Sequence, residues 1–71
     1  MTLGELTKVF SNDTKIKISL LSSTNSEVIY TGTIYNYSSA LAYKWSDNEF
    51  KNFDVTNAFI ADNVIDVLIE S

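Results

Sequence analysis

Residues 61–70, Ala-Asp-Asn-Val-Ile-Asp-Val-Leu-Ile-Glu, contain the turn and the strand that decide the fold class of this chain. Asp and Asn favour turns, and Asn63 can adopt the left-handed backbone conformation that a tight turn needs. After the turn, every second residue of the stretch 65–69 is apolar and β-branched, which is the period of a β-strand. Residues 54–60 precede the turn and are rich in apolar side chains. The last third of the chain therefore predicts a β-hairpin.

A second hairpin is predicted upstream. In residues 14–21, isoleucine and leucine alternate with lysine and serine, as in a strand with one buried and one wet face. A polar loop over 22–27 leads to residues 28–35, which are rich in β-branched and aromatic side chains and predict a second strand. Gly32 interrupts that strand and indicates either a bulge or a close approach of another group to the backbone.

The chain also begins with a helix signal. Residues 2–5, Thr-Leu-Gly-Glu, have the form of a capping box, in which the threonine hydroxyl and the glutamate carboxylate satisfy opposing backbone donors. Steps of three and four place the following apolar residues on one helical stripe: Leu3, Leu6, Val9 and Phe10. Residues 11–13, Ser-Asn-Asp, favour a turn and end the helix.

The stretch 36–52 leaves several arrangements open. We expect a helix somewhere between Ser38 and Lys51, either as one helix, as two short ones, or as a helix followed by a loop. Residues 46–49, Ser-Asp-Asn-Glu, form a second capping box that precedes Phe50. The boundaries in this part of the chain do not follow from the sequence pattern.

The element order α-β-β-α-β-β predicts an α+β fold, a small antiparallel sheet of about four strands with one or two helices on one face. The 71 residues form a single domain, 1–71. A chain of this length buries only about 60% of its unfolded surface, so its stability is marginal. Cysteine is absent, which excludes disulfides, and we expect either a well-packed core or self-association to compensate.

The composition argues against an enzyme and against a cofactor. Histidine and cysteine are absent, so the commonest metal ligands and the commonest neutral-pH base are missing. The two glycines lie far apart and form no phosphate-binding loop, and no serine nucleophile motif occurs. Net charge is −4 and arginine is absent, which disfavours nucleic-acid binding. Asp62, Asp66 and Glu70 have even spacing, but we interpret them as a solvated sheet edge; no metal site is expected.

The aromatic residues are the strongest sign of a contact surface. Tyrosine and tryptophan combine a large apolar body with a polar group and are enriched at interfaces. Val64 and Leu68 fall on the opposite face of the last strand from its isoleucines, so both faces of that strand are apolar, and a second subunit would cover one of them. The predicted interaction surface, in a possible homodimer, consists of Tyr35, Tyr37, Tyr43, Trp45, Val64 and Leu68.

Three stretches carry a family resemblance: residues 13–18, Asp-Thr-Lys-Ile-Lys-Ile; residues 28–33, Val-Ile-Tyr-Thr-Gly-Thr; and residues 54–69. With the opening Thr-Leu-Gly-Glu-Leu they resemble small uncharacterised proteins carried by phages and conjugative elements of low-GC Gram-positive bacteria. The arginine-free, asparagine-rich and isoleucine-rich composition is consistent with an AT-rich genome. The resemblance implies no catalytic motif.

The leading hypothesis is a non-enzymatic protein-interaction module of a mobile genetic element that self-associates. The alternative is an acidic inhibitor that mimics DNA and acts on a host nucleic-acid-binding protein; a contiguous row of carboxylates would favour it, and interspersed lysines would count against it. Direct nucleic-acid binding through Lys8, Lys15 and Lys17 ranks third. The start of the chain lacks a signal-peptide pattern and no apolar run is long enough to cross a membrane, so we expect a cytoplasmic protein with no membrane partner.

Overall fold

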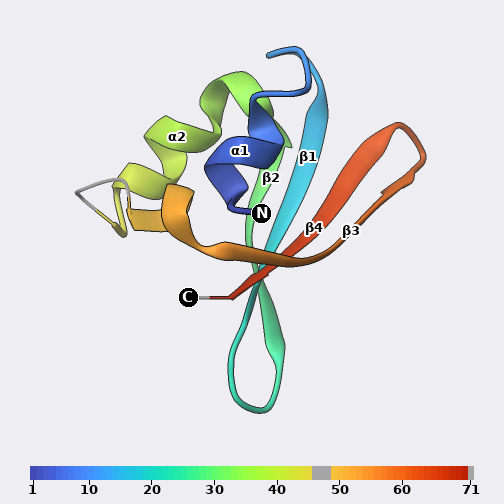
Figure 1. The fold of residues 1–71 in the computed structure, drawn as a ribbon. Coiled ribbons are helices and arrows are strands. Elements are labelled where there is room, and N and C mark those ends of the chain that lie inside the picture. The colour runs from blue at the N-terminus through green and yellow to red at the C-terminus, as the bar shows by residue number, and fades with distance from the viewer. Residues whose placement is uncertain (46–48, 71) are drawn as a thin grey trace.

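The sheet consists of two β-hairpins whose inner strands lie side by side (Figure 1). The computed structural model describes residues 1–45 and 49–70. Strand β1, Lys15–Leu21, pairs antiparallel with β2, Ser26–Thr33, and β3, Asp54–Ala61, pairs antiparallel with β4, Val64–Glu70. The order across the sheet is β2-β1-β4-β3. The α+β class and the element order α-β-β-α-β-β are confirmed.

The two central strands, β1 and β4, run parallel, so the sheet is mixed, whereas the sequence led us to expect an antiparallel one. After β2, the chain continues through the helical layer and forms β3 at the far edge of the sheet. It then turns back and forms β4, which lies between β3 and β1 (Figure 1). This route gives the two central positions to the strands with the most regular apolar alternation. Their inward-facing side chains are almost fully buried: Ile16, Ile18, Ile65, Val67 and Ile69.

The turn between β3 and β4 has the predicted chemistry. Asp62 and Asn63 both have positive φ, 54° and 62°, which is the pattern of a type I′ turn. Ala61 and Val64 pair directly on either side of it. Because Asn and Asp tolerate the left-handed conformation better than other non-glycine residues, they connect the two strands by the shortest route.

Gly32 marks a close approach, the second of the two alternatives that the sequence left open. The Tyr30 hydroxyl donates a hydrogen bond of 2.6 Å to the Thr33 carbonyl and so lies across the glycine. A Cβ atom on Gly32 would come within 2.6 Å of that hydroxyl oxygen. The irregularity in the pairing of β2 with β1 occurs elsewhere, where Ile18 and Ser19 face Tyr30 and Val28 and leave Ile29 unpaired.

Helix α1, Leu3–Thr7, is shorter than the predicted stripe. The capping box is present: the Glu5 N–H donates to the Thr2 hydroxyl at 3.2 Å, and the Thr2 N–H donates to the Glu5 carboxylate at 2.8 Å. Leu3 and Leu6 are buried as expected, but the helix ends before Val9, whose side chain is 69% exposed. The prediction that Val9 belongs to the buried stripe was wrong because the helix stops two residues earlier.

Helix α2, Ile34–Ala42, begins earlier than predicted, directly after β2. Residues 34 and 35 have strand-like side chains, and the sequence pattern predicts that they belong to the second strand. Ile34, Tyr37 and Leu41 are buried at helical spacing against the sheet, and this tertiary contact overrides local β propensity. The capping box predicted at 46–49 falls mainly outside the described residues. It is followed by η1, Glu49–Asn52, a single 3₁₀ turn that buries Phe50.

The core lies between the helices and the inner face of the sheet. Its largest fully buried side chain is Phe50, which comes from the short η1 turn. Leu3 of α1 is also fully buried, and its N–H donates at 2.9 Å to the carbonyl of Phe53, the residue that follows η1. A Cβ on Gly4 would come within 3.1 Å of the Lys51 carbonyl oxygen, which shows how closely these two segments pack.

Replacing Phe50 by alanine should destabilise the domain by about 3–5 kcal/mol, because the change removes the largest buried ring and leaves a cavity. Tyr43 is 94% exposed and serves as the matched aromatic control. Tyr43→Ala should change the free energy of unfolding by less than about 0.5 kcal/mol. Chemical denaturation followed by circular dichroism measures both values, and equal effects of the two substitutions would contradict this packing.

The Thr2 backbone N–H, followed by the Thr2 side chain, lowers the pKa of Glu5 below its ordinary value of 4.5. Because the folded pKa lies below the unfolded one, this contact contributes stability above pH 4.5 and loses it as the pH falls through the lowered value. Thr2→Ala removes the hydroxyl but keeps the backbone donor, so the pKa of Glu5 should rise only part of the way back.

NMR titration of the side-chain carboxyl resonances measures this shift. Asp13 supplies the internal control, since its pKa is lowered chiefly by the Ser11 hydroxyl, which donates at 2.6 Å. Thr2→Ala should leave Asp13 unchanged, and Ser11→Ala should raise the pKa of Asp13 while leaving Glu5 unchanged. An unaltered Glu5 titration in Thr2→Ala would show that the capping box does not form.

Candidate binding surfaces

The four aromatic residues that the sequence singled out in and after α2 have different environments. Tyr35 is 72% exposed and Tyr43 is 94% exposed, so both are accessible to a partner. Tyr37 is only 6% exposed and belongs to the core, which corrects its assignment to the interaction surface. Trp45 is half-buried, and its ring packs edge-on against Phe53 with centroids 5.5 Å apart.

Tyr37 connects three segments of the helical layer. Its ring packs edge-on against Phe50 with centroids 5.8 Å apart, and its hydroxyl lies 3.0 Å from the Thr7 hydroxyl. The Thr7 hydroxyl donates its single proton to the Gly4 carbonyl at 3.1 Å, so the Tyr37 hydroxyl must be the donor toward Thr7. This buried chain of hydrogen bonds holds α2 against α1, and the ring contact adds η1.

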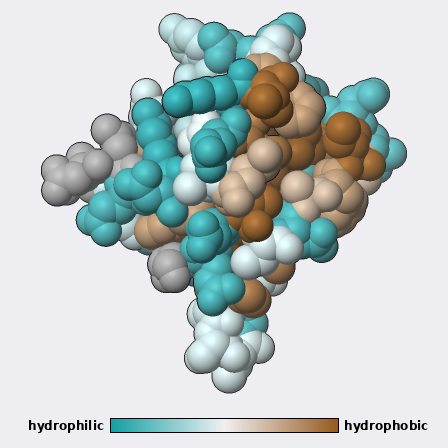
Figure 2. All heavy atoms as spheres, viewed as in Figure 1, coloured by the Kyte–Doolittle hydropathy of each residue, from teal (hydrophilic) through white to brown (hydrophobic). Residues whose placement is uncertain are grey.

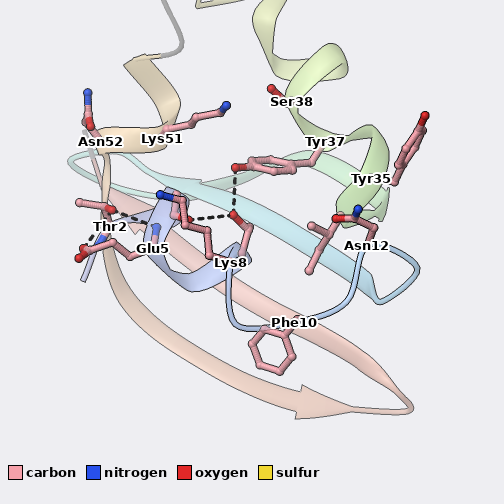
Figure 3. A pocket seen from close by; sticks show the side chains of 13 residues that line it. Thr2, Glu5, Lys8, Phe10, Asn12, Tyr35, Tyr37, Ser38, Lys51 and Asn52 are labelled. Atoms are coloured by element: carbon pink, nitrogen blue, oxygen red, sulfur yellow. Dashed lines mark hydrogen bonds between the residues drawn. The ribbon is translucent and has the colours of Figure 1, made fainter.

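An open groove of about 870 Å³ lies between α1, α2 and η1 (Figure 3). The ammonium groups of Lys8 and Lys51 line it, together with one carboxylate, that of Glu5, which the capping box already engages. In Figure 3, Lys51 extends from η1 toward α2, while the Phe10 ring turns away from Tyr37 and Lys51. The groove therefore offers hydrogen-bond donors and a small excess of positive charge, in a chain that is acidic as a whole.

The other face of the sheet carries no helix (Figure 1). Val64 and Leu68 lie there, half-buried, because their neighbours in β4 point into the core. Lys17 and Asp66 are directly opposite in the parallel pair, and their charged atoms are 3.8 Å apart. Since α2 packs on the opposite side of the sheet, the six predicted surface residues do not form one contiguous surface, which corrects the sequence-based prediction.

A surface that the sequence did not reveal lies along β3 on the helix-bearing side. Ala58 and Ile60 face that side because they pair with the buried Val67 and Ile65. The helices do not extend over them, and Ile60 is 66% exposed. Figure 2 shows the apolar surface gathered on this half of the molecule, whereas the side near α2 is mainly hydrophilic. We define the β3 patch as Ala58 and Ile60.

The β3 patch could not have been found from periodicity alone. The pairing of β3 with β4 shifts between Val55 and Asn57, and the Thr56 hydroxyl donates to the Leu68 carbonyl within this irregularity. The bulge places Val55 and Ala58 on the same face although they are three residues apart. A strict alternation therefore cannot assign the faces of β3, and the early end of α1 at Thr7 has no clear signal in the sequence.

Carboxylates form no cluster with metal-site geometry within residues 1–45 and 49–70. Asp66 lies beside Lys17 on the helix-free face of the sheet. Over the same described ranges, no helix combines the length and the apolar character that crossing a membrane requires. Comparisons of this chain with protein-family models, curated proteins and solved structures found no match.

Tyr37→Phe should destabilise the domain by about 0.5–1.5 kcal/mol, because it removes one buried hydrogen bond and keeps the ring contact with Phe50. Thr7→Val, which removes the other hydroxyl at similar volume, should cost a similar amount, and the double variant should cost less than the sum of the two. Thermal and urea unfolding of the four proteins gives this double-mutant cycle. Strictly additive costs would show that the two hydroxyls do not interact.

Proposed function

We propose that this chain is a protein-binding module that acts by contact and not by catalysis, and that self-association is part of its role. The observation that carries the proposal is the β3 patch beside a free strand edge. Ile60 on one face of β3 and Phe59 on the other are 66% and 53% exposed. Both lie beyond the start of the strand, where Thr2 pairs with Asp54 and the Val55 N–H donates to the Met1 carbonyl at 2.8 Å on the outer edge.

The energetics of burial support this role. Covering a large aliphatic side chain contributes about 1.5–3 kcal/mol, and a free strand edge adds backbone hydrogen-bonding groups that a partner can pair. Val9 and Ile60 are both more than half exposed, at 69% and 66%. A small domain gains from covering such side chains, because its own core is too small to contribute a large margin of stability.

The arrangement of charges counts against the acidic-inhibitor alternative. A mimic of a nucleic-acid backbone needs a contiguous row of carboxylates. On the helix-free face, Lys17 of β1 stands directly opposite Asp66 of β4, and their charged atoms are 3.8 Å apart. Lys8 and Lys51 add positive charge on the helical side. Interspersed charges of this kind are typical of a solvated protein surface.

The resemblance to small proteins of phages and conjugative elements supports placing this module on a mobile genetic element. A contact protein of such an element would act on a second protein, either its own copy or a host factor. The genes that flank this one test the origin: phage or transfer genes would support it, and a conserved chromosomal operon would count against it.

Site-specific photo-crosslinking in cells tests the proposed function. A benzoylphenylalanine at position 60 lies on the β3 patch, and the same residue at Val28 gives a matched control on the opposite edge of the sheet, where exposure is also above half. Adducts should form at position 60 and not at position 28, and their mass shows whether the captured chain is this protein or another one. Absence of any adduct at position 60 would overturn the proposed function.

A further inference from the structure

We propose that the edge of β3 pairs with the same edge of a second copy of this chain, in antiparallel orientation along residues 57–61, to form one continuous eight-stranded sheet. This inference rests on the proposed protein-binding function and names the partner and the register. Three observations carry it: the absence of charge along residues 55–61 of β3, the interruptions along the competing edge, and the residues that a two-fold axis brings together.

The β3 edge has the features of a strand that accepts a partner. Residues 55–61 contain no charged side chain and no proline, although the chain has nine carboxylates. Charges and prolines are the usual means by which exposed edges avoid pairing, and they are absent here. The bulge at Thr56 lies near the start of the strand, so residues 57–61 continue in regular register with β4. A second acidic copy can approach this edge without facing a carboxylate.

The opposite edge, β2, is protected. Glu27 carries a charge on this strand, and the extra residue Ile29 bulges out of the pairing with β1. Near its end, Gly32 adopts a φ of 158° beneath the Tyr30 hydroxyl, which is held by the Thr33 carbonyl. A bulge and a charge interrupt the regular ladder that another strand would need. The two edges of the sheet are therefore not equivalent, and β3 is the one available for pairing.

Symmetry restricts how two β3 edges can meet. Two identical strands pair antiparallel only around a two-fold axis that is perpendicular to the sheet, and this operation keeps each face of one sheet continuous with the same face of the other. Directly opposite residues must therefore come from the same face. In β3, Ala58 and Ile60 face the helices, whereas Asn57, Phe59 and Ala61 face the other side. A register is therefore allowed only if it pairs each helix-facing residue with a helix-facing residue of the second copy, and each residue of the other face with one of that same face.

Among the allowed registers, the one centred on Phe59 pairs all five residues. It places Phe59 opposite Phe59 of the second copy on the helix-free face, and Ile60 opposite Ala58 of the second copy on the helix-bearing face. Both large exposed side chains of the edge are covered at once. A register centred on Ala58 would bring Asp62 of each copy near Asp54 of the other, where two carboxylates repel each other. A register centred on Ile60 pairs only three residues between Phe59 and Ala61.

The same axis brings the two β3 patches together. Since the faces are preserved, the helices of both copies lie on the same side of the extended sheet, and the uncovered half of each sheet adjoins the uncovered half of the other. Ala58 and Ile60 of each copy then form a shared apolar strip that spans the axis. The contact would combine backbone hydrogen bonds along the edge with burial of side chains on both faces, which is the pattern of strand addition.

Sedimentation equilibrium of the purified full chain tests the assembly. The mass at high micromolar concentration should be twice the monomer mass of 8.0 kDa. Ile60→Lys places a charge on the edge and should shift the midpoint of dimerisation at least about tenfold toward higher concentration. Val28→Lys, on the β2 edge, is the matched control and should leave the midpoint unchanged. Circular dichroism checks that both variants fold. A monomeric wild type, or equal weakening by both variants, would overturn the proposal.

Disulfide trapping tests the register, because the natural chain has no cysteine. In the register centred on Phe59, the two Cα atoms of residue 59 lie about 4.5–5.5 Å apart, within the range of a disulfide. Phe59→Cys should therefore form a covalent dimer on mild oxidation. Asn57→Cys should not link to itself, because the two copies are offset by four residues, about 13 Å along the strand. A mixture of Asn57→Cys and Ala61→Cys should form the mixed dimer.

Preferential self-linking of Ala58→Cys or Ile60→Cys would overturn this register, and a dimer in which no β3 cysteine links would overturn pairing through this edge. These outcomes are separable from failure of the proposed function. A monomer in solution together with crosslinks at position 60 to a different protein would remove the self-pairing and leave the binding function intact. A monomer with no crosslinks at position 60 would remove both.

Discussion

The packing of the helical layer onto the parallel pair β1–β4 is the interaction on which the rest of the structure depends. The central strands bury Ile16, Ile18, Ile65, Val67 and Ile69, and the layer above them is closed by Phe50 from a single 3₁₀ turn. A chain without disulfides has little else to hold it together. The core covers the two central strands and leaves both edge strands partly exposed. The edge strand β2 has an irregular backbone, whereas the edge strand β3 keeps an accessible apolar strip.

Much of the fold follows from local sequence patterns. The period-two alternation identified one strand of each hairpin, residues 14–21 and 65–69, because a half-buried strand alternates apolar and polar side chains. Asp62 and Asn63 indicated the turn, and Thr2 and Glu5 indicated the capping box, because each pair acts through neighbouring backbone atoms. Interactions of this range are encoded within a few residues and can be identified from the sequence alone.

The other features depend on contacts between distant residues. Ile34 and Tyr37 have strand-like side chains, yet they form the buried stripe of α2 because the sheet lies beneath them. The parallel direction of β1 and β4 is set by the route of the chain through the helical layer, and no local pattern encodes it. For the same reason the predicted surface was only partly accessible: the exposure of Tyr35 and the burial of Tyr37 are decided by which side of a helix meets the core.

The inequality of the two sheet edges also limits how far assembly can proceed. A sheet with two open edges can add copies at both ends and grow without limit, as fibrils do. Here the bulge and the charge along β2 leave one edge that accepts a strand and one that does not. When the accepting edges of two copies meet, the combined sheet ends in β2 at both margins. In the proposed dimer, the irregular strand β2 would therefore act as a terminator and keep the apolar edge from becoming the start of a polymer.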